Sequence, residues 1–168
     1  MSTRLLRLKR GETLVVRPLR NGDVDTVLAV FHRLGDDARR RRFNGAKPRL
    51  SEDELWQLAR VDANHHALVA YVPGDREPVA LARLARTGSS AEIAFEVADE
   101  YQQRGIGSAL TEELLALARA AGITEITALV SADNSAALAL LRRALDALEI
   151  SFEGRELAIT AALSDAAC

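Results

Sequence analysis

The chain has 168 residues, of which 48% are hydrophobic and 27% charged, and its formal net charge at pH 7 is −2. These values are typical of one globular domain with its own core, and the small charge excludes a global field that would attract nucleic acid or anionic lipid. No stretch is apolar enough to cross a membrane, and the N-terminus lacks the apolar core of a signal peptide. We therefore expect a single cytoplasmic domain over 1–168, with 1–12 and 164–168 poorly ordered.

The first half of the chain predicts one strand followed by three helices. Apolar and β-branched residues precede Pro18, and after a turn an apolar stripe at helical spacing runs from Val24 to Leu34. Ser51 and Glu54 form a Ser-x-x-Glu capping box at the start of a further helix. The expected elements are a strand over 13–20 and helices between 24 and 34, over about 37–44 and from 52 onward.

Four successive arginines, residues 39–42, lie within the second of these helices. Successive residues point in all directions around a helix, so this run predicts a solvated and partly salt-bridged helix rather than a stripe that contacts nucleic acid. We therefore expect neither nucleic acid nor a membrane among the partners.

From Asn64 onward the hydrophobic period changes from 3.6 to 2. Three strands separated by turn residues predict an antiparallel meander, which a helix, a strand, a second helix and a terminal hairpin follow. This order predicts a mixed α/β (α+β) fold rather than a series of parallel βαβ units. The expected elements are strands over 66–72, 78–86 and 91–98, a helix over 106–121, a strand over 123–131, a helix over 134–147, and strands over 149–153 and 156–163.

The most informative stretch joins strand 91–98 to helix 106–121 through a turn that contains Gly105 and Gly107. Glycines let a ligand approach the backbone closely, and a helix start offers free N–H groups and the positive end of its dipole, so such a turn can bind phosphate. A dinucleotide-binding fingerprint would need a third glycine where Leu110 stands, and no Gly-Lys-Ser/Thr follows as in a P-loop. The alternative is a helix start whose glycines serve only tight packing.

The spacing Gln-x-x-Gly-x-Gly, which begins at Gln102, resembles the acyl-CoA signature of the GNAT family of N-acetyltransferases. The predicted order of elements is similar to the fold of that family over nearly the whole chain. The resemblance implies a mixed, mostly antiparallel central sheet of about seven strands flanked by helices. It also implies acetyl-CoA as cosubstrate, with its pantetheine arm entering between a fourth and a fifth strand that splay apart.

Other segments resemble the catalytic domain of bacterial protein lysine acetyltransferases of the Pat type. The resemblance implies transfer of an acetyl group to a primary amine, with a protein lysine as the favoured acceptor and a small-molecule amine as the rival. The sequence also leaves open a non-catalytic acyl-CoA-binding domain and a homodimer. The segments are Arg42-Phe43, Leu50-Ser51, Glu54-Leu55, Val61-Asp62, residues 66–70 and residues 91–95.

Strand 91–98 carries two candidate general bases. Glu92 and Glu96 share one face with small alanines and lie two strand repeats apart, which is roughly 13 Å. A carboxylate among alanines on a central strand would be partly desolvated, and desolvation raises a carboxyl pKa toward what a base for lysine needs. Glu92 matches the presumed base of the Pat-type domains, whereas Glu96 has no counterpart there. The alternative is that both are ordinary solvent-facing glutamates.

Contacts to acetyl-CoA are expected mainly from the backbone. The strand end near Val97 would bind the pantetheine amides as an added strand does, and the N–H groups of 103–108 would surround the pyrophosphate. Arg104 either adds a charge to a phosphate or lies in solvent. Asn134 matches an asparagine that the family places near pantetheine, although a plain helix cap explains it equally well. The expected cofactor-binding residues are Val97, Gln102, Gln103, Arg104, Gly105, Ile106, Gly107, Ser108 and Asn134.

Neither a side-chain acid for the leaving thiolate nor a metal ion is expected at this site. Many GNAT enzymes protonate the leaving thiolate with a tyrosine seven residues after the asparagine, and Leu141 stands there. Water would then supply the proton, or the thiolate would leave unaided, because the pKa of a thiol is low enough for either. A metal site is not expected either, because the adjacent His65 and His66 face opposite sides of a strand and His32 stands alone.

Overall fold

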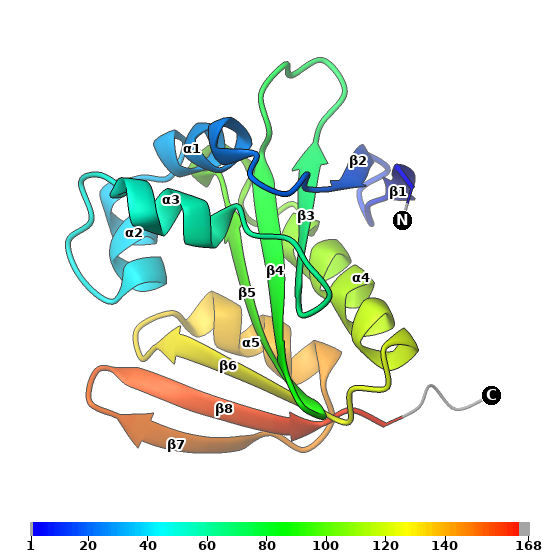
Figure 1. Ribbon diagram of the computed structural model, residues 1–168, viewed down its shortest axis with the longest axis vertical. Coiled ribbons are helices and arrows are strands. Elements are labelled where there is room, and N and C mark those ends of the chain that lie inside the picture. Colours follow the sequence, from blue (N-terminus) through cyan, green and yellow to red (C-terminus); the bar gives the residue numbers. More distant parts are fainter. Residues whose placement is uncertain (1, 165–168) are drawn as a thin grey trace.

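The structure is a computed structural model that describes residues 2–164. Of residues 164–168, which we expected to be poorly ordered, only Ser164 lies within the described residues. The elements predicted from residue 13 onward are all present, and their ends differ from the prediction by a few residues (Figure 1). In chain order the elements are β1 (Arg4–Arg7), β2 (Thr13–Pro18), α1 (Val24–His32), α2 (Asp36–Phe43), α3 (Glu52–Leu58), β3 (His65–Tyr71), β4 (Ala80–Thr87), β5 (Ser90–Val97), the 3₁₀ turn η1 (Asp99–Tyr101), α4 (Ile106–Ala120), β6 (Glu125–Ser131), α5 (Ser135–Ala144), β7 (Glu149–Glu153) and β8 (Glu156–Ala162).

The strands form one mixed sheet in the order β1-β2-β3-β4-β5-β6-β8-β7. Every neighbouring pair is antiparallel except β5 and β6, which are parallel. The mixed, mostly antiparallel sheet is therefore confirmed, but with eight strands in the described residues rather than about seven.

The additional strand is β1, which lies in the segment 1–12 that we expected to be poorly ordered. Residues 4–7 pair antiparallel with residues 13–16 of β2, and the connecting turn is closed by a hydrogen bond from Leu8 N to Glu12 O at 2.8 Å. Leu8 is buried in the main core and Leu6 packs against it. These two leucines anchor a segment that otherwise carries mostly charged and polar side chains, which is why the prediction of disorder was wrong here.

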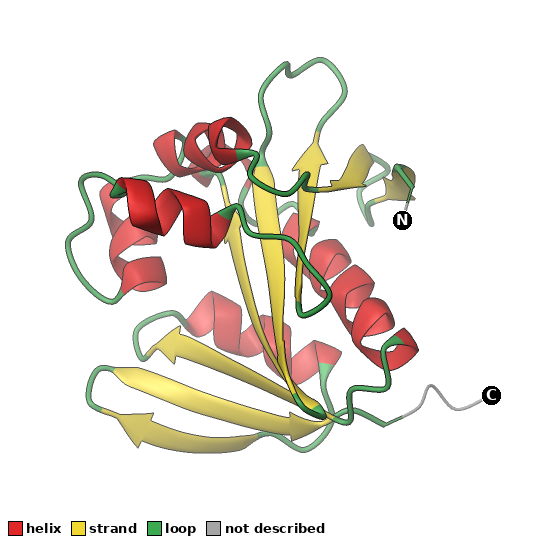
Figure 2. Ribbon diagram, in the orientation of Figure 1, coloured by secondary structure: helices red, strands yellow, loops and turns green. Residues whose placement is uncertain are grey.

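Helices cover both faces of the sheet, so alternate residues of a central strand enter different cores (Figure 2). Leu68 and Ala70 of β3 pack in the larger core with α4 and α5, whereas Ala67 and Val69 pack in the smaller core with α1 and α3. The helix α2 buries none of its residues and lies against β6. Within residues 2–164, no helix is both long and apolar enough to span a membrane.

The sheet forks between β5 and β6. The two strands pair only where residues 90–92 lie beside 125–127, after which β5 continues along β4 and β6 continues along β8. Figure 1 shows the two strands meeting at one end and diverging toward the other. Counted from β2 these are the fourth and fifth strands, so the predicted splay is confirmed.

Candidate active site

The helix α4 starts without a side-chain cap, directly after Gly105. Gly105 has φ of +88°, a conformation that costs other residues about 1–2 kcal/mol, and a Cβ built there would meet no atom within 4 Å. The N–H groups of the first helical turn have no partner within a helix, and here no side chain caps them. The result is an open group of backbone donors at the positive end of the α4 dipole, as a phosphate site requires.

Gly107 lies inside α4 and serves a different purpose. A Cβ at this position would lie 3.0 Å from Leu140 Cδ1 of α5 and 4.0 Å from the ring of Phe95. The absence of a side chain therefore lets α4 approach α5 closely. Of the two roles considered for the glycines, tight packing is the one observed at Gly107.

The side chain of Gln102 forms hydrogen bonds with the end of β5 and with η1. Its Nε2 donates to Val97 O and to Asp99 Oδ1, both at 3.2 Å. The expected pantetheine-binding strand end and the start of the glycine turn are thus directly connected. Gln102, Gln103 and Gly105 are exposed, whereas Ile106 is buried in the main core and holds the start of α4 in place.

Arg104 is engaged by the neighbouring hairpin. Its Nε donates to Glu12 Oε2 at 3.1 Å and its Nη2 to Glu12 Oε1 at 2.5 Å, and its guanidinium lies 4.6 Å from the centre of the Tyr101 ring. The hydrogen bond from Arg104 lowers the pKa of Glu12. A contact between Arg104 and a phosphate would therefore require an exchange of partners, a constraint that the sequence did not indicate.

Glu92 lies at the point where β5 and β6 separate. It is the last residue of β5 that pairs with β6, opposite Thr127. Ile93 and Phe95 of β5 pack toward α4, so the alternation of the strand directs Glu92 to the opposite face, where its side chain is exposed. The partial desolvation that we expected for Glu92 is not observed, because the alanines beside it leave it open to solvent.

Glu96 occupies the same face of β5 but a different environment. It is only 6% exposed, and Arg42 Nε of α2 donates to its Oε1 at 2.7 Å. Arg83 of β4 stands opposite Ala94, between the two glutamates, and its Nη2 donates to Gln57 O at 2.9 Å. Burial, followed by the charge of Arg42, lowers the pKa of Arg83. The two carboxylates therefore share a face, as predicted, but among residues 2–164 Glu96 has an ion-pair partner and Glu92 has none.

The successive arginines of α2 pair mainly with acidic side chains of other elements of the fold. Besides the pair between Arg42 and Glu96, Arg40 Nη2 donates to Asp133 Oδ2 at 2.7 Å, and Arg41 Nε lies 3.7 Å from Asp133 Oδ1. The Ser131 hydroxyl and Arg40 together lower the pKa of Asp133 to about 2. These pairs connect α2 to both arms of the fork. The sequence placed Arg42 in the Pat-type segment, but it did not identify Glu96 as its partner.

Asn134 caps α5, since its Oδ1 accepts a hydrogen bond from Ala137 N at 3.1 Å. This is the helix-cap alternative considered from the sequence. Leu141 is fully buried in the main core, so this position offers no proton donor. The two tyrosines are engaged elsewhere, Tyr71 accepting from Arg17 Nη2 at 2.7 Å and Tyr101 donating to Asp75 Oδ2 at 2.8 Å.

Within residues 2–164, no group of three or more histidine, cysteine, aspartate or glutamate side chains is arranged to hold a metal ion. His65 instead forms a 2.8 Å contact between its Nδ1 and Asp62 Oδ1. That contact and two backbone N–H groups lower the pKa of Asp62 well below its usual range.

A mixed sheet that forks at its parallel pair, with an uncapped and glycine-led helix start packed against the fork, defines the N-acetyltransferase class. The chain belongs to the acetyltransferase (GNAT) family, whose model matches residues 31–146. The chain therefore carries an acetyltransferase domain of the GNAT type.

Within this family the chain is similar to Pat-type proteins. It is 33% identical over 147 residues to the acetyltransferase Pat of Mycolicibacterium smegmatis, a match that covers 85% of this chain and 43% of that protein. It is 32% identical over 134 residues to an acetyltransferase of Pseudomonas aeruginosa, covering 77% and 72%. The crystal structure of the GNAT domain of S. lividans PAT superposes with a TM-score of 0.86 at 28% identity, covering 96% of this chain and 97% of that one. The chain thus spans less than half the length of the M. smegmatis protein.

Proposed function

We propose that this protein transfers the acetyl group of acetyl-CoA to the side-chain amine of a lysine in another protein, and that Glu92 is the general base. The observation that carries this proposal is the position of Glu92, which is exposed at the point where β5 and β6 separate and forms no ion pair with any residue that the structure describes. The similarity to Pat-type proteins supports a protein lysine as the acceptor.

The two reactants would approach the fork from opposite faces of the sheet. The start of α4 lies on the face toward which Phe95 packs, and the side chain of Glu92 lies on the other face, with α2 nearby through Arg42 and Glu96. A thioester entering between the diverging strands would then meet an amine held beside Glu92. Such alignment supplies much of the rate enhancement in a transfer between two bound molecules.

The chemistry needs one proton acceptor on the amine side. The lysine ammonium gives a proton to the Glu92 carboxylate, directly or through a water, and the free amine attacks the thioester carbonyl. The C–S bond breaks as the C–N bond forms, the attacking nitrogen releases its second proton to water, and the thiolate leaves unprotonated or takes a proton from water. Leu141 cannot supply that proton, and a thiol with a pKa of about 8.5 does not need a protein acid.

Acetyl-CoA binding would use the groups predicted from the sequence, with two adjustments. We assign the pyrophosphate to the amides of 103–108 and the pantetheine arm to the free edge of β5 near Val97. Asn134 Oδ1 caps α5, which leaves the amide nitrogen of Asn134 for the pantetheine arm. Arg104 stays with Glu12 unless a phosphate replaces that carboxylate.

The acceptor class is tested by following thiol release from acetyl-CoA with matched acceptors. We expect release with lysine-containing peptides blocked at their N-termini, and none with the same peptides acetylated on lysine. Polyamines, free amino acids and aminoglycosides form the comparison panel. Release only with members of that panel would identify a small-molecule acetyltransferase instead.

A non-catalytic acyl-CoA-binding domain is the second candidate, and the buried Leu141 in place of a proton donor favours it. Under that function coenzyme A would bind, yet no acceptor would release thiol above the rate of hydrolysis.

The homodimer remains a prediction. Sedimentation equilibrium of the full chain measures the mass of the particle in solution, which equals the mass of one chain for a monomer and of two chains for a homodimer.

A further inference from the structure

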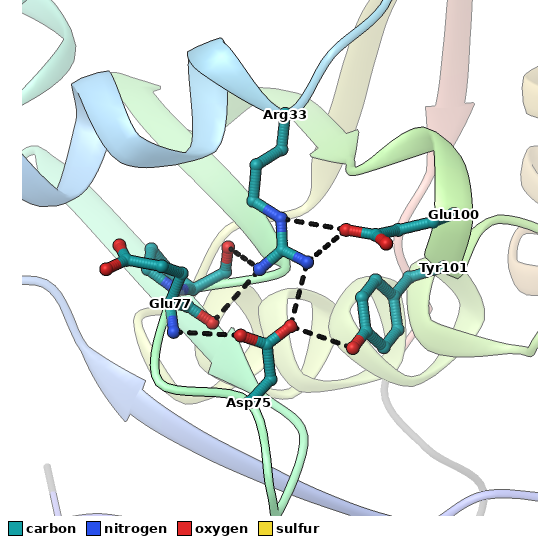
Figure 3. Close-up of polar contacts among 6 residues, drawn as sticks. Arg33, Asp75, Glu77, Glu100 and Tyr101 are labelled. Carbon is teal, nitrogen blue, oxygen red and sulfur yellow. Dashed lines mark hydrogen bonds and ion pairs between the residues drawn. The ribbon is translucent and has the colours of Figure 1, made fainter.

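The end of α1 is tied to the turn η1, which leads into the acetyl-CoA-binding turn (Figure 3). Arg33 Nε donates to Glu100 Oε1 at 3.1 Å, and Arg33 Nη2 donates to Asp75 Oδ2 at 2.8 Å and also to Glu100. Asp75, from the loop between β3 and β4, accepts a further hydrogen bond from the Tyr101 hydroxyl at 2.8 Å. One guanidinium thus joins three segments that are distant in the sequence.

The backbone makes the same connection. Asp99 N donates to Arg33 O at 3.3 Å, and Gly35 packs so closely that a Cβ there would lie 2.4 Å from Asp99 Oδ2. The joint between α1 and α2 therefore contacts η1 through both main chain and side chains. The two segments are therefore in direct contact at this joint.

The ion pair between Arg33 and Asp75 is better shielded than most pairs of this protein. Their side chains are 18% and 20% exposed, so solvent weakens the attraction less than at a fully exposed pair. The hydrogen bond from Arg33 is the main reason that the pKa of Asp75 lies well below its usual range, and the bond to Asp75 raises the pKa of Arg33. Both groups are therefore charged at neutral pH.

Tyr101 extends the connection into the glycine turn. The Arg33 guanidinium lies 5.2 Å from the centre of the Tyr101 ring and the Arg104 guanidinium 4.6 Å from it. Arg104 is in turn held by Glu12. The exposed residues Gln102 and Gln103 lie just before the backbone N–H groups at the start of α4. They are therefore held on both sides, by Tyr101 before them and by Arg104 after them.

We propose that Arg33 is a positioning residue for acetyl-CoA binding. It fixes η1 and thereby keeps the amides of 103–108 in the arrangement that receives the pyrophosphate. Donors that are already in place lose little entropy on binding, so the loss of this restraint weakens binding without touching the reacting atoms. The inference rests on the proposed function of the glycine turn.

The test compares Arg33→Ala with Arg17→Ala in the full chain. Arg17 is a matched control because, like Arg33, it pairs with an aspartate (Asp23) and lies over a tyrosine ring (Tyr71), but it belongs to β2. We expect Arg33→Ala to weaken coenzyme A binding about tenfold by calorimetry and to raise the KM for acetyl-CoA equally, with kcat at saturation within about twofold. Arg17→Ala should lower the melting temperature only. Arg33→Lys should restore part of the affinity, since lysine keeps the charge but not the fork of donors.

Wild-type affinity in Arg33→Ala, or an equal loss in both alanine variants, would overturn the positioning role and leave the proposed function standing. Failure of the wild-type chain to bind coenzyme A would instead remove the proposed function. If Arg33→Ala does not fold, Tyr101→Phe serves as the variant, because it deletes only the hydroxyl that bonds Asp75. It should weaken coenzyme A binding about threefold, and unchanged binding would count against the proposal.

Discussion

Replacing Glu92 with glutamine should lower kcat by about 10²- to 10⁴-fold, the usual contribution of a positioned general base. Glutamine has nearly the same shape and cannot accept the proton of the lysine ammonium. Because Glu92 is exposed and makes no ion pair within the described part of the chain, the substitution should leave the free energy of unfolding nearly unchanged. Steady-state kinetics at saturating acetyl-CoA and calorimetry with coenzyme A measure the two effects separately.

The control for this substitution is Glu149→Gln, which changes an exposed glutamate of the edge strand β7, separated from β5 by β6 and β8. Its kcat should equal that of the wild type. If Glu92→Gln also retained full kcat with a productive acceptor, Glu92 would not be the base. The proton would then have to pass to another group or directly to solvent.

Replacing Gly105 with asparagine should abolish most coenzyme A binding, with a loss of affinity on the order of a hundredfold. Asparagine is one of the few residues that adopt left-handed backbone angles at low cost, so stability should fall by about 1 kcal/mol or less. The new side chain would project into the space that is open at Gly105, where the pyrophosphate would approach the backbone. Calorimetric titration with coenzyme A and chemical denaturation provide the two readouts.

Gly122→Asn at the other end of α4 is the matched control, since Gly122 also has positive φ and open space at its Cβ position. It should bind coenzyme A as the wild type does. Equal affinity in Gly105→Asn and Gly122→Asn would mean that no ligand approaches the backbone at Gly105.

Local patterns were sufficient to predict the meander and the glycine turn. Each depends on hydrophobic period and turn residues within short windows, and the family resemblance supplied the splay between strands. The strand β1 escaped prediction because its burial rests on Leu6 and Leu8 in a charged segment, and because β2 supplies its hydrogen bonds. Hydrogen-bonded pairing between two strands can be recognised only when the positions of both strands are known.

The sequence could not assign partners to charged side chains. Arg33 lies 42 residues from Asp75 and 67 from Glu100, and Arg104 lies 92 residues from Glu12, so no spacing rule connects them. The strand period placed Glu92 and Glu96 on one face, but the difference between them arises from Arg42 of α2. Likewise, the role of Gly107 depends on where α5 lies, which a motif of two glycines does not state.

The central claim is that the backbone amides at the start of α4 bind the pyrophosphate of acetyl-CoA. The most direct measurement is a titration of the ¹⁵N-labelled chain with coenzyme A, followed by amide chemical shifts. We predict that the resonances of 103–108 shift together and saturate with one ligand per chain, while those of β7 stay in place. If coenzyme A saturates the protein and the resonances of 103–108 do not move, the site is elsewhere and the account is contradicted.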